Sequence, residues 1–276
     1  MRLHVGCAQW THPAWPQPAR LKLAAYASWV NAVESNTTFY GIPARSSVEK
    51  WAAQTPPDFR FVVKLPQVIT HERRLGNIAA EFYAFAAAVE PLGSRNHAMW
   101  VQLPASFAPG DLGTLAAFLN GAPREHRYAV EVRHPAFFDD PRVAAQLEQV
   151  LARAGAEWVP FDTGTLFGHR PTSLAERDAW MKKPRVARRT TALTGHPIVR
   201  YIGRDSVSET VDGWAYLVDL VHTWLTEGRS PTIFLHTPDN AEALNLARLF
   251  HQTLRTRLPS LAPLPEPVSL EPPTLF

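Results

Sequence analysis

The chain has 276 residues, of which 46% are hydrophobic and 19% charged, a composition that excludes a disordered or fibrous protein. Its formal net charge of +3 favours anionic ligands but is too small to indicate nucleic-acid binding by itself. It holds one cysteine, Cys7, and no apolar run as long as a membrane span, and its opening residues, MRLHVGCAQW, enter a strand without a charged and apolar leader. We therefore expect a cytoplasmic protein with no membrane association.

Short strand-like runs recur along the chain at a spacing of roughly thirty residues. They occupy residues 4–10, 32–40, 60–66, 97–104, 127–134, 157–163, 197–203 and 232–238. Several of these runs end in proline, as in KLP, QLP, RHP and HTP. Because proline has no N–H for a sheet ladder, these prolines mark where strands end.

Helical patterns separate the runs. The segment 141–154 places Val143, Leu147, Val150 and Leu151 on one face. Asp140 suits the N-cap of this helix, Pro141 its first turn and Gly155 its C-terminal exit. The segment 212–227 repeats the pattern, and a last helix is expected to start near Asn240.

Strands that alternate with helices predict parallel pairing through right-handed crossovers. Eight such units favour an α/β fold that is a single, parallel eight-stranded (β/α)₈ TIM-like barrel over residues 1–258, followed by a proline-rich tail over 259–276 without regular structure at the surface. The alternative is a doubly wound open sheet, but GCAQW after the first strand is not a G-x-G-x-x-G turn. Residues 164–196 form a long connection between strands six and seven and contain the basic run KKPRVARR at 182–189.

Nearly every predicted strand carries a polar or charged residue late in its length. In strand five, Glu131 and Arg133 share one face, opposite Val130 and Val132. The side chains of a barrel strand alternate between inside and outside, and the catalytic groups of such enzymes lie at the C-terminal strand ends. We therefore predict a polar ring at the barrel mouth, made of Glu34, Asn36, Lys64, Gln102, Glu131, Arg133, Asp162, Arg200 and His236.

These residue types suit an enzyme that acts on a small anionic or sugar-like substrate, such as a hydrolase, lyase or isomerase without a cofactor. Lys64, Arg133 and Arg200 would bind a phosphate or carboxylate through charge-assisted hydrogen bonds. Glu131, with Asp162, Glu34 or His236, would transfer protons. Lys64 could instead form a Schiff base if its pKa were lowered. Further substrate contacts are predicted for Asn36, Gln102, Tyr40, Trp10 and His71.

Four other interpretations stay open. The ring could be an ion-pair network that sets strand register and does no chemistry, since structural networks also perturb ionisation. Glu34, Glu131, Asp162 and His236 could hold an oxygen-loving cation, although no H-E-x-x-H or Cys/His cluster is present and we predict no metal. The basic run could bind nucleic acid, or serve as a solvated loop. The barrel could also be a non-catalytic scaffold; no obligate protein partner is predicted.

Several motifs resemble those of the YecE-like proteins, the family known as domain of unknown function 72. They are VESNTTFYGIP, FRFVVKLPQVITHERRL, WVQLPASF, AVEVRHPAFF, PIVRYIG and TIFLHTPDNAEALNLA, and they run in the family's order from about residue 4 to residue 255. The resemblance implies a TIM-like barrel, but it implies no settled activity. It also implies a likeness to xylose-isomerase-like and apurinic-endonuclease-like barrels, from which nucleic-acid binding has been suggested by analogy of fold.

Overall fold

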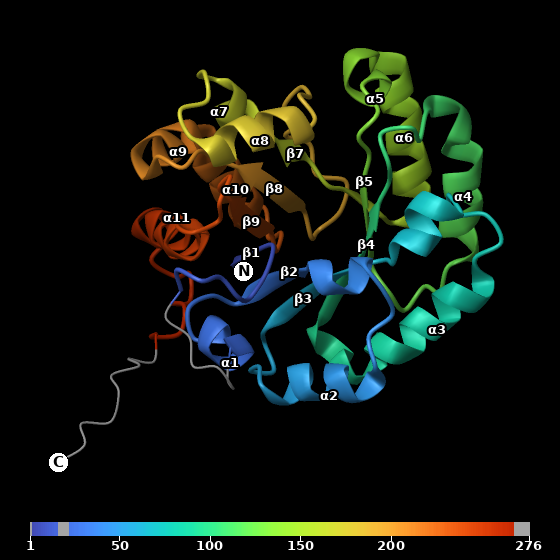
Figure 1. The fold of residues 1–276 in the computed structure, drawn as a ribbon, viewed down its shortest axis with the longest axis horizontal. Coiled ribbons are helices and arrows are strands. Elements are labelled where there is room, and N and C mark those ends of the chain that lie inside the picture. Colours follow the sequence, from blue (N-terminus) through green and yellow to red (C-terminus); the bar gives the residue numbers. More distant parts are fainter. Residues whose placement is uncertain (1, 16–21, 268–276) are drawn as a thin grey trace.

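The protein is described here from a computed structural model, which covers residues 2–15 and 22–267. Its centre is a nine-stranded parallel sheet with the order β6-β5-β4-β3-β2-β1-β9-β8-β7, curled so that helices cover its outside (Figure 1). The strands are β1 His4–Cys7, β2 Ala32–Ser35, β3 Arg60–Lys64, β4 Asn96–Gln102, β5 Tyr128–Glu131, β6 Glu157–Trp158, β7 Phe161–Asp162, β8 Ile198–Ile202 and β9 Thr232–His236.

Helices follow most of the strands. They are α1 Lys22–Ala27, α2 Arg45–Ala53, α3 Ala79–Val89, α4 Leu112–Gly121, α5 Ala136–Asp139, α6 Pro141–Ala154, α7 Gly164–Phe167, α8 Leu174–Lys182, α9 Val207–Gly213, α10 Ala215–Thr226 and α11 Ala243–Arg257. Short 3₁₀ turns occupy Asn36–Phe39, Glu90–Arg95 and Pro109–Asp111, and one π-helical turn spans Val68–Glu72.

The prediction of a closed eight-stranded barrel is wrong, although the parallel α/β class is right, because the predicted sixth strand is broken into two. Its first half, β6, pairs with β5, and its second half, β7, pairs with β8. Between them, Val159 donates its N–H to the carbonyl of Val130, and the carbonyl of Pro160 accepts from Arg200. Since Pro160 has no N–H, the ladder cannot continue through this point. The described sheet is therefore a curled, half-barrel arrangement whose two ends, β6 and β7, do not pair with each other.

The interior of the curl is arranged in tiers along the strands. The middle tier is apolar and consists of Ala32, Val62, Ala98, Trp100, Ala129, Val159, Ile198 and Phe234. Residues two positions further along the same strands point the same way, because side chains alternate along a strand. This parity aims Glu34, Lys64, Gln102, Glu131, Arg200 and His236 into the curl at the ends of their strands. The larger core lies outside the sheet, between strands and helices.

Gly6 illustrates how closely β1 and β2 approach. A Cβ added at Gly6 would lie 1.9 Å from the carbonyl oxygen of Ala32. The hydroxyl of Tyr26 joins the two strands there, because it accepts from the N–H of Cys7 and donates to the carbonyl of Ala32. Any side chain at position 6 would therefore push the two strands apart.

The helix predicted at 141–154 is confirmed to the residue as α6. Asp140 accepts from the N–H of Arg142, and Gly155 ends the helix in the left-handed region at φ 65°. The second strand is shorter than predicted, because it ends at Ser35 and the chain turns at once into the 3₁₀ helix Asn36–Phe39. The long connection 164–196 contains two short helices that were not predicted, α7 and α8.

The tail prediction is only partly right. Residues 259–267 form no helix or strand, but Leu261 and Leu264 are buried against the core instead of lying at the surface. Arg255 donates to the carbonyl of Leu261, and Arg248 donates to the carbonyl of Pro265. The rest of the tail lies outside the described residues. No helix within the described part of the chain is long and apolar enough to cross a membrane.

Candidate active site at the carboxyl ends of the strands

Glu34 is the centre of a buried charged cluster. Its side chain is fully buried, and its Oε1 lies 2.6 Å from Nζ of Lys64 and 3.1 Å from Nη2 of Arg200. Its Oε2 lies 3.1 Å from Nε2 of His236. Lys64 also donates to Oε1 of Gln102 at 2.9 Å. Five predicted residues from β2, β3, β4, β8 and β9 are thus brought together.

Glu131 forms the second half of this cluster. Its Oε1 accepts from Nε of Arg133 at 2.7 Å, and its Oε2 lies 3.7 Å from Nη1 of Arg200. Glu131 is fully buried, yet Oε2 makes no hydrogen bond among the described residues. A buried carboxylate oxygen without a donor is costly, so this atom has capacity to accept a hydrogen bond from a ligand.

Aromatic rings lie beside the cations of the cluster. Nζ of Lys64 lies 4.9 Å from the centre of the Trp100 ring, and the Arg200 guanidinium lies 5.0 Å from the Phe161 ring. Arg133 lies over the same Phe161 ring at 5.5 Å. These contacts favour cations and exclude water on that side, so the charges interact in a medium of low dielectric.

The pKa values of the two carboxyls are set by opposed effects. Burial raises the pKa of Glu34, but Arg200 and Lys64 outweigh it and hold that pKa well below its usual range. Burial likewise raises the pKa of Glu131, and Arg133 with Arg200 lowers it below the usual value. Both groups are therefore carboxylates at neutral pH.

The pKa values of the basic groups in the cluster are also lowered, in their case mainly by burial. Burial lowers the pKa of Lys64 to about 8, although Glu34 partly offsets it. Burial and the neighbouring Arg200 lower the pKa of His236 to about 4, so its imidazole is neutral. Nε2 of His236 lies 3.1 Å from both Nε of Arg200 and Oε2 of Glu34. A neutral nitrogen can accept from Arg200 or donate to Glu34, but it cannot do both.

Lys183, which the sequence prediction missed, stands at the outer side of the cluster. Its Nζ lies 6.0 Å from the Phe161 ring, and the side chain makes no ion pair among the described residues. Burial and the nearby Arg200 and Arg133 lower its pKa to about 8. The only sequence signal for Lys183 was its place in the basic run, because the fold of segment 164–196 brings it to the strand ends.

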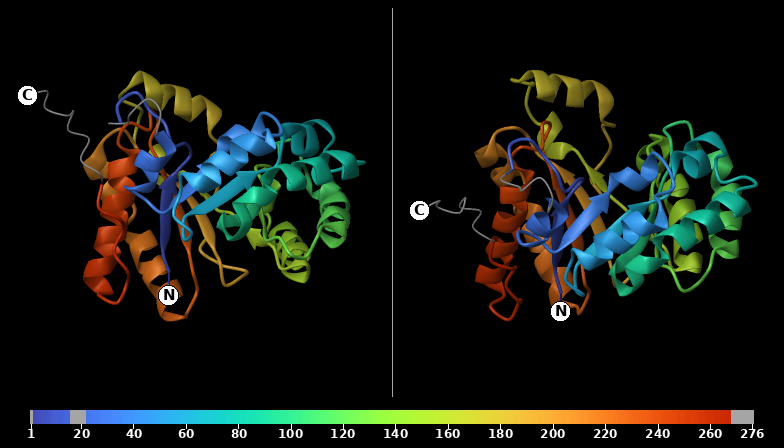
Figure 2. Two further views of the ribbon diagram at one scale, coloured as in Figure 1. Left: turned by 90° about the horizontal axis from the view of Figure 1, so that it is seen from below. Right: turned by 60° about the horizontal axis from the view of Figure 1, so that its bottom comes forward.

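Segment 164–196 is held against the sheet by buried and stacked cations. The guanidinium of Arg204, which follows β8, contacts both carboxylate oxygens of Glu176 in α8 at 2.9 and 3.0 Å, and both residues are almost fully buried. Arg189 lies over the Trp158 ring at 4.1 Å and pairs with Glu148 at 2.6 Å. Figure 2 shows α8 beyond the strand ends, opposite the end at which β1 begins.

Asp162 does not join the cluster around Glu34. Its side chain accepts from Tyr216 of α10 and from the N–H of Gly164, and it pairs with Nε of Arg188 at 3.3 Å. Phe161, one residue earlier, takes the inward position, and so Asp162 faces the helices. Burial raises the pKa of Asp162.

The other predicted contacts lie around the cluster or have structural partners. Asn36 donates to the carbonyl of Ala8, which ties the end of β2 to β1. Nδ1 of His71 lies 2.9 Å from the hydroxyl of Thr70, and burial lowers its pKa. Tyr40 is 76% exposed, and Trp10 packs edge-on against Trp51 with ring centres 5.4 Å apart.

The described residues contain no group of three or more His, Cys, Asp or Glu side chains placed to hold a metal ion. In the cluster, the carboxylates of Glu34 and Glu131 instead face Lys64, Arg133 and Arg200. Together with Lys183, the cations outnumber the carboxylates. The arrangement therefore suits an anion better than a cation.

The fold and the site together define a parallel α/β protein of barrel-like architecture with a buried charged cluster at the carboxyl ends of its strands. Residues 4–269 match the family model described as "Protein of unknown function DUF72". The chain belongs to this family of uncharacterised function.

Relatives and solved structures agree with that membership. The chain is 35% identical to the UPF0759 protein YecE of Escherichia coli O157:H7 over 95% of this chain and 96% of that protein. It is 38% identical to YunF of Bacillus subtilis over 26% of this chain and 27% of that one. Crystal structures of DUF72 family proteins from Enterococcus faecalis and Thermotoga maritima superpose with TM-scores of 0.71 and 0.68 at 20% and 22% identity. They cover 92% of this chain, and 95% and 100% of those chains respectively.

Proposed function

We propose that the cluster is the active site of an enzyme that acts on a small anionic or sugar-like substrate by acid–base chemistry. The observation that carries the proposal is the unpartnered Oε2 of buried Glu131, which lies beside Arg133, Arg200 and Lys183. A ligand with a phosphate or carboxylate and an acidic O–H or C–H would supply an anion for the cations and a proton for this oxygen.

Glu131 is assigned the role of general base. Its pKa is lowered, so it is ionised at neutral pH, and Oε2 is not occupied by another donor. It would take a proton from the substrate to give the neutral acid and later return it. Several hydrolases, lyases and isomerases open with a proton transfer of this kind.

Arg133 and Lys183 are assigned to the substrate anion. Arg133 uses Nε for Glu131, which leaves its two Nη groups for a planar oxyanion, and its side chain is 25% exposed. Lys183 makes no ion pair within the described chain and approaches from α8's side. Deeper than Arg133 and Lys183 lie Glu34, Lys64, Gln102 and His236. We assign them the role of positioning Arg200 and setting the electrostatic potential of the site.

A panel of phosphate- and carboxylate-bearing metabolites, tested by calorimetry and then for turnover, examines this assignment. We expect Arg133→Gln and Lys183→Gln each to weaken binding about tenfold or more, which is the loss for one charge-assisted contact. Arg185→Gln is the matched control, because Arg185 lies in the same segment but stacks on Phe167.

Glu131→Gln separates catalysis from structure. It should keep the fold and the bound ligand but abolish turnover, since the amide cannot accept the proton. If Glu131→Gln unfolds the protein, or if both cation variants bind every anion as the wild type does, the ion-pair network is structural and the proposal fails.

Nucleic-acid binding is a second candidate, supported by the charge of segment 164–196, which has seven Lys and Arg residues against two carboxylates. Against it, Arg188 stacks on Tyr216 at 3.6 Å and Arg189 stacks on Trp158, so these two cations of the run already have partners within the protein. Titration with single- and double-stranded oligonucleotides at two salt concentrations decides it. Phosphate contacts predict affinity that falls steeply with salt, and an absence of binding at low salt removes the candidate.

A further inference from the structure

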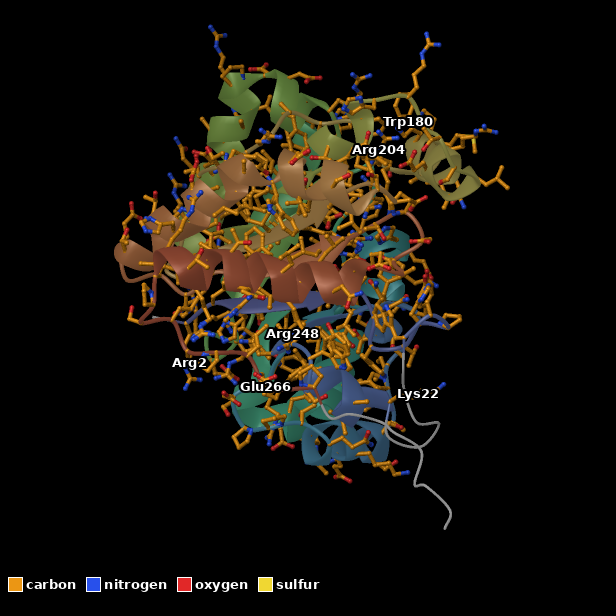
Figure 3. The ribbon with its side chains drawn as sticks, turned by 90° about the vertical axis from the view of Figure 1, so that its left-hand side faces the viewer. Arg2, Lys22, Trp180, Arg204, Arg248 and Glu266 are labelled. Atoms are coloured by element: carbon orange, nitrogen blue, oxygen red, sulfur yellow. The ribbon has the colours of Figure 1, made fainter. Side chains whose placement is uncertain are left out.

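A second polar tier lies at the opposite end of the strands, where they begin. It contains His4 at the start of β1, Arg60 at the start of β3, Thr232 at the start of β9, and Arg127 and His196 just before β5 and β8. The apolar middle tier, with Trp100 and Phe234 stacked 6.0 Å apart, separates it from the cluster around Glu34. Figure 3 places Arg2 at the end of the molecule opposite Trp180 and Arg204.

His97 enters this tier through an irregularity in β4. The pairing of β3 with β4 shifts between Phe61, which faces Asn96, and Val62, which faces Ala98, so His97 is an extra residue. Such a bulge redirects a side chain. The ring of His97 lies 5.2 Å from that of His4 and 5.6 Å from that of His196.

A cavity of about 120 Å³ opens beside these histidines and is lined in part by His97, Arg127, Glu157, Thr194 and His196. Since a water molecule takes up about 30 Å³ of liquid, this space is large enough for one phosphate-sized oxyanion. Bulky apolar side chains dominate the packed layers inside a (β/α)₈ barrel, so a polar tier at this position is unusual for packing alone.

Several nitrogens of the tier lack good partners. Nδ1 of His196, which lines the cavity, and Nδ1 of His4, whose side chain is 4% exposed, are buried and make no hydrogen bond among the described residues. The contacts of His97 are long, at 3.4 Å to Nη1 of Arg127 and 3.3 Å to the hydroxyl of Thr232. Buried polar atoms left in this way favour a ligand that supplies partners.

The tier is electropositive. Burial, followed by Arg60, Arg2, His196 and Arg127, lowers the pKa of His4 to about 3. Burial, His4 and Arg127 lower that of His97 to about 2.

The nearby carboxylates do not cancel these charges. Asp58 raises the pKa of Arg60, but burial, followed by Arg2, Arg127 and Arg95, lowers that pKa on balance. Glu157, which lines the cavity, already accepts from Thr194 through both N–H and hydroxyl and from the N–H groups of Trp158 and Leu193. Its oxygens are thereby occupied.

We propose that this end of the strands is a second binding site, which takes the phosphate group of a small ligand in the cavity between Arg127, His97 and His196. Exposed Arg127 supplies the charge-assisted hydrogen bonds, and the imidazole of His196 donates through Nδ1. The site is independent of the chemistry proposed at the carboxyl ends, because no side chain is shared and the apolar tier intervenes.

Inorganic phosphate is the probe, followed through the ring resonances of histidines assigned by NMR. In wild type, phosphate should shift the resonances of His97 and His196. In Arg127→Gln the same shifts should need at least about ten times more phosphate. Arg133→Gln, in the other cluster, should leave the titration of His97 and His196 unchanged, which separates this site from the proposed active site.

A small phosphomonoester, run in parallel, distinguishes the free anion from a phosphate carried on an organic group. Tighter binding of the ester assigns an organic phosphate, and tighter binding of inorganic phosphate assigns the free anion. Thermal unfolding of Arg127→Gln checks that the variant is folded; if it is not, His196→Phe replaces it and the shift of His97 alone is followed. The proposal is overturned if the two histidines do not respond to either probe, or if they respond equally in wild type and in the folded variant.

Discussion

Replacing Glu34 by glutamine tests whether the buried cluster acts as one unit. The amide keeps the shape of the side chain but leaves Lys64 and Arg200 without their shared carboxylate, at original distances of 2.6 and 3.1 Å. With an effective dielectric constant of about 20, the lost attractions are roughly 6 and 5 kcal/mol. Part is recovered because the amide oxygen still accepts a hydrogen bond, Arg200 keeps Glu131, and Lys64 can lose its proton. We expect a net loss of about 3–5 kcal/mol in the free energy of unfolding.

This loss in the free energy of unfolding should also depend on pH, and the ionisation of Lys64 decides whether it grows or shrinks as the pH rises. Its pKa in the folded protein is about 8, against a usual value of 10.5, and Glu34 is one of the groups that keep it from falling further. Without Glu34 this pKa drops, so the folded variant sheds the proton at lower pH than the wild type does. The difference in the free energy of unfolding between wild type and Glu34→Gln is therefore largest below the pKa of Lys64 in the variant. It shrinks as the pH rises from there to about 8. Above that, the part due to Arg200 remains.

Urea unfolding of both proteins at pH 6, 7 and 9 measures these quantities. Glu227→Gln is the control, because Glu227 pairs with Arg229 at 2.9 Å with a side chain that is 47% exposed. Such surface pairs contribute about 0–1 kcal/mol. The reasoning is refuted if Glu34→Gln loses no more stability than the control, or if its loss is the same at pH 6 and pH 9.

Four further predictions follow from single contacts. The lowered pKa of Glu131 stabilises the folded protein above about pH 4.5, and this stabilisation is lost as the pH falls through the pKa of the folded state. The free energy of unfolding of Glu131→Gln, measured with urea, should therefore change less with pH below about 4.5 than that of the wild type. Arg204→Met leaves Glu176 buried without its cation and should cost about 3–5 kcal/mol and speed proteolysis within 164–196, whereas the exposed Arg257→Met should do neither. Cys7 is fully buried with a raised pKa, so thiol reagents should modify it only at the rate of unfolding; fast labelling of the native protein would contradict its burial. Nitrogen NMR should find Nε2 of His236 unprotonated in the free protein, where it accepts from Arg200, and a protonated Nε2 would reverse that assignment.

Local patterns sufficed to predict much of the fold. Helix α6 was predicted to the residue, because an amphipathic period, a capping aspartate and a terminal glycine all mark the same segment. The strand cores were found because buried parallel strands read as apolar runs. The break at Pro160 was not foreseen, although proline was used elsewhere as a strand-end signal. Here it lies inside a run, and only the pairing of its two halves with different neighbours reveals the break.

The candidate site was predictable where strand parity alone decides direction. Glu34, Lys64 and Glu131 each follow an inward apolar or small residue by two positions, and the structure places them together. Asp162 was assigned by being polar and late in its run, whereas parity gives the inward position to Phe161. Lys183 could not be found by either rule, because its position depends on how segment 164–196 folds back over the strand ends.

The hydrogen bonds that the cluster leaves unmade bear on whether it is a site or a structural network. Both oxygens of Glu34 lie within 3.1 Å of nitrogen atoms, although Oε1 makes no hydrogen bond among the described residues. Oε2 of Glu131 also has no hydrogen bond, only a 3.7 Å contact with Arg200, and Lys183 has no ion pair in the described chain. A network selected only for stability would gain most by satisfying every member, since a half-satisfied buried network is worse than an apolar core. Unmet bonding capacity at both carboxylates and at Lys183 therefore favours the proposed site over a purely structural network.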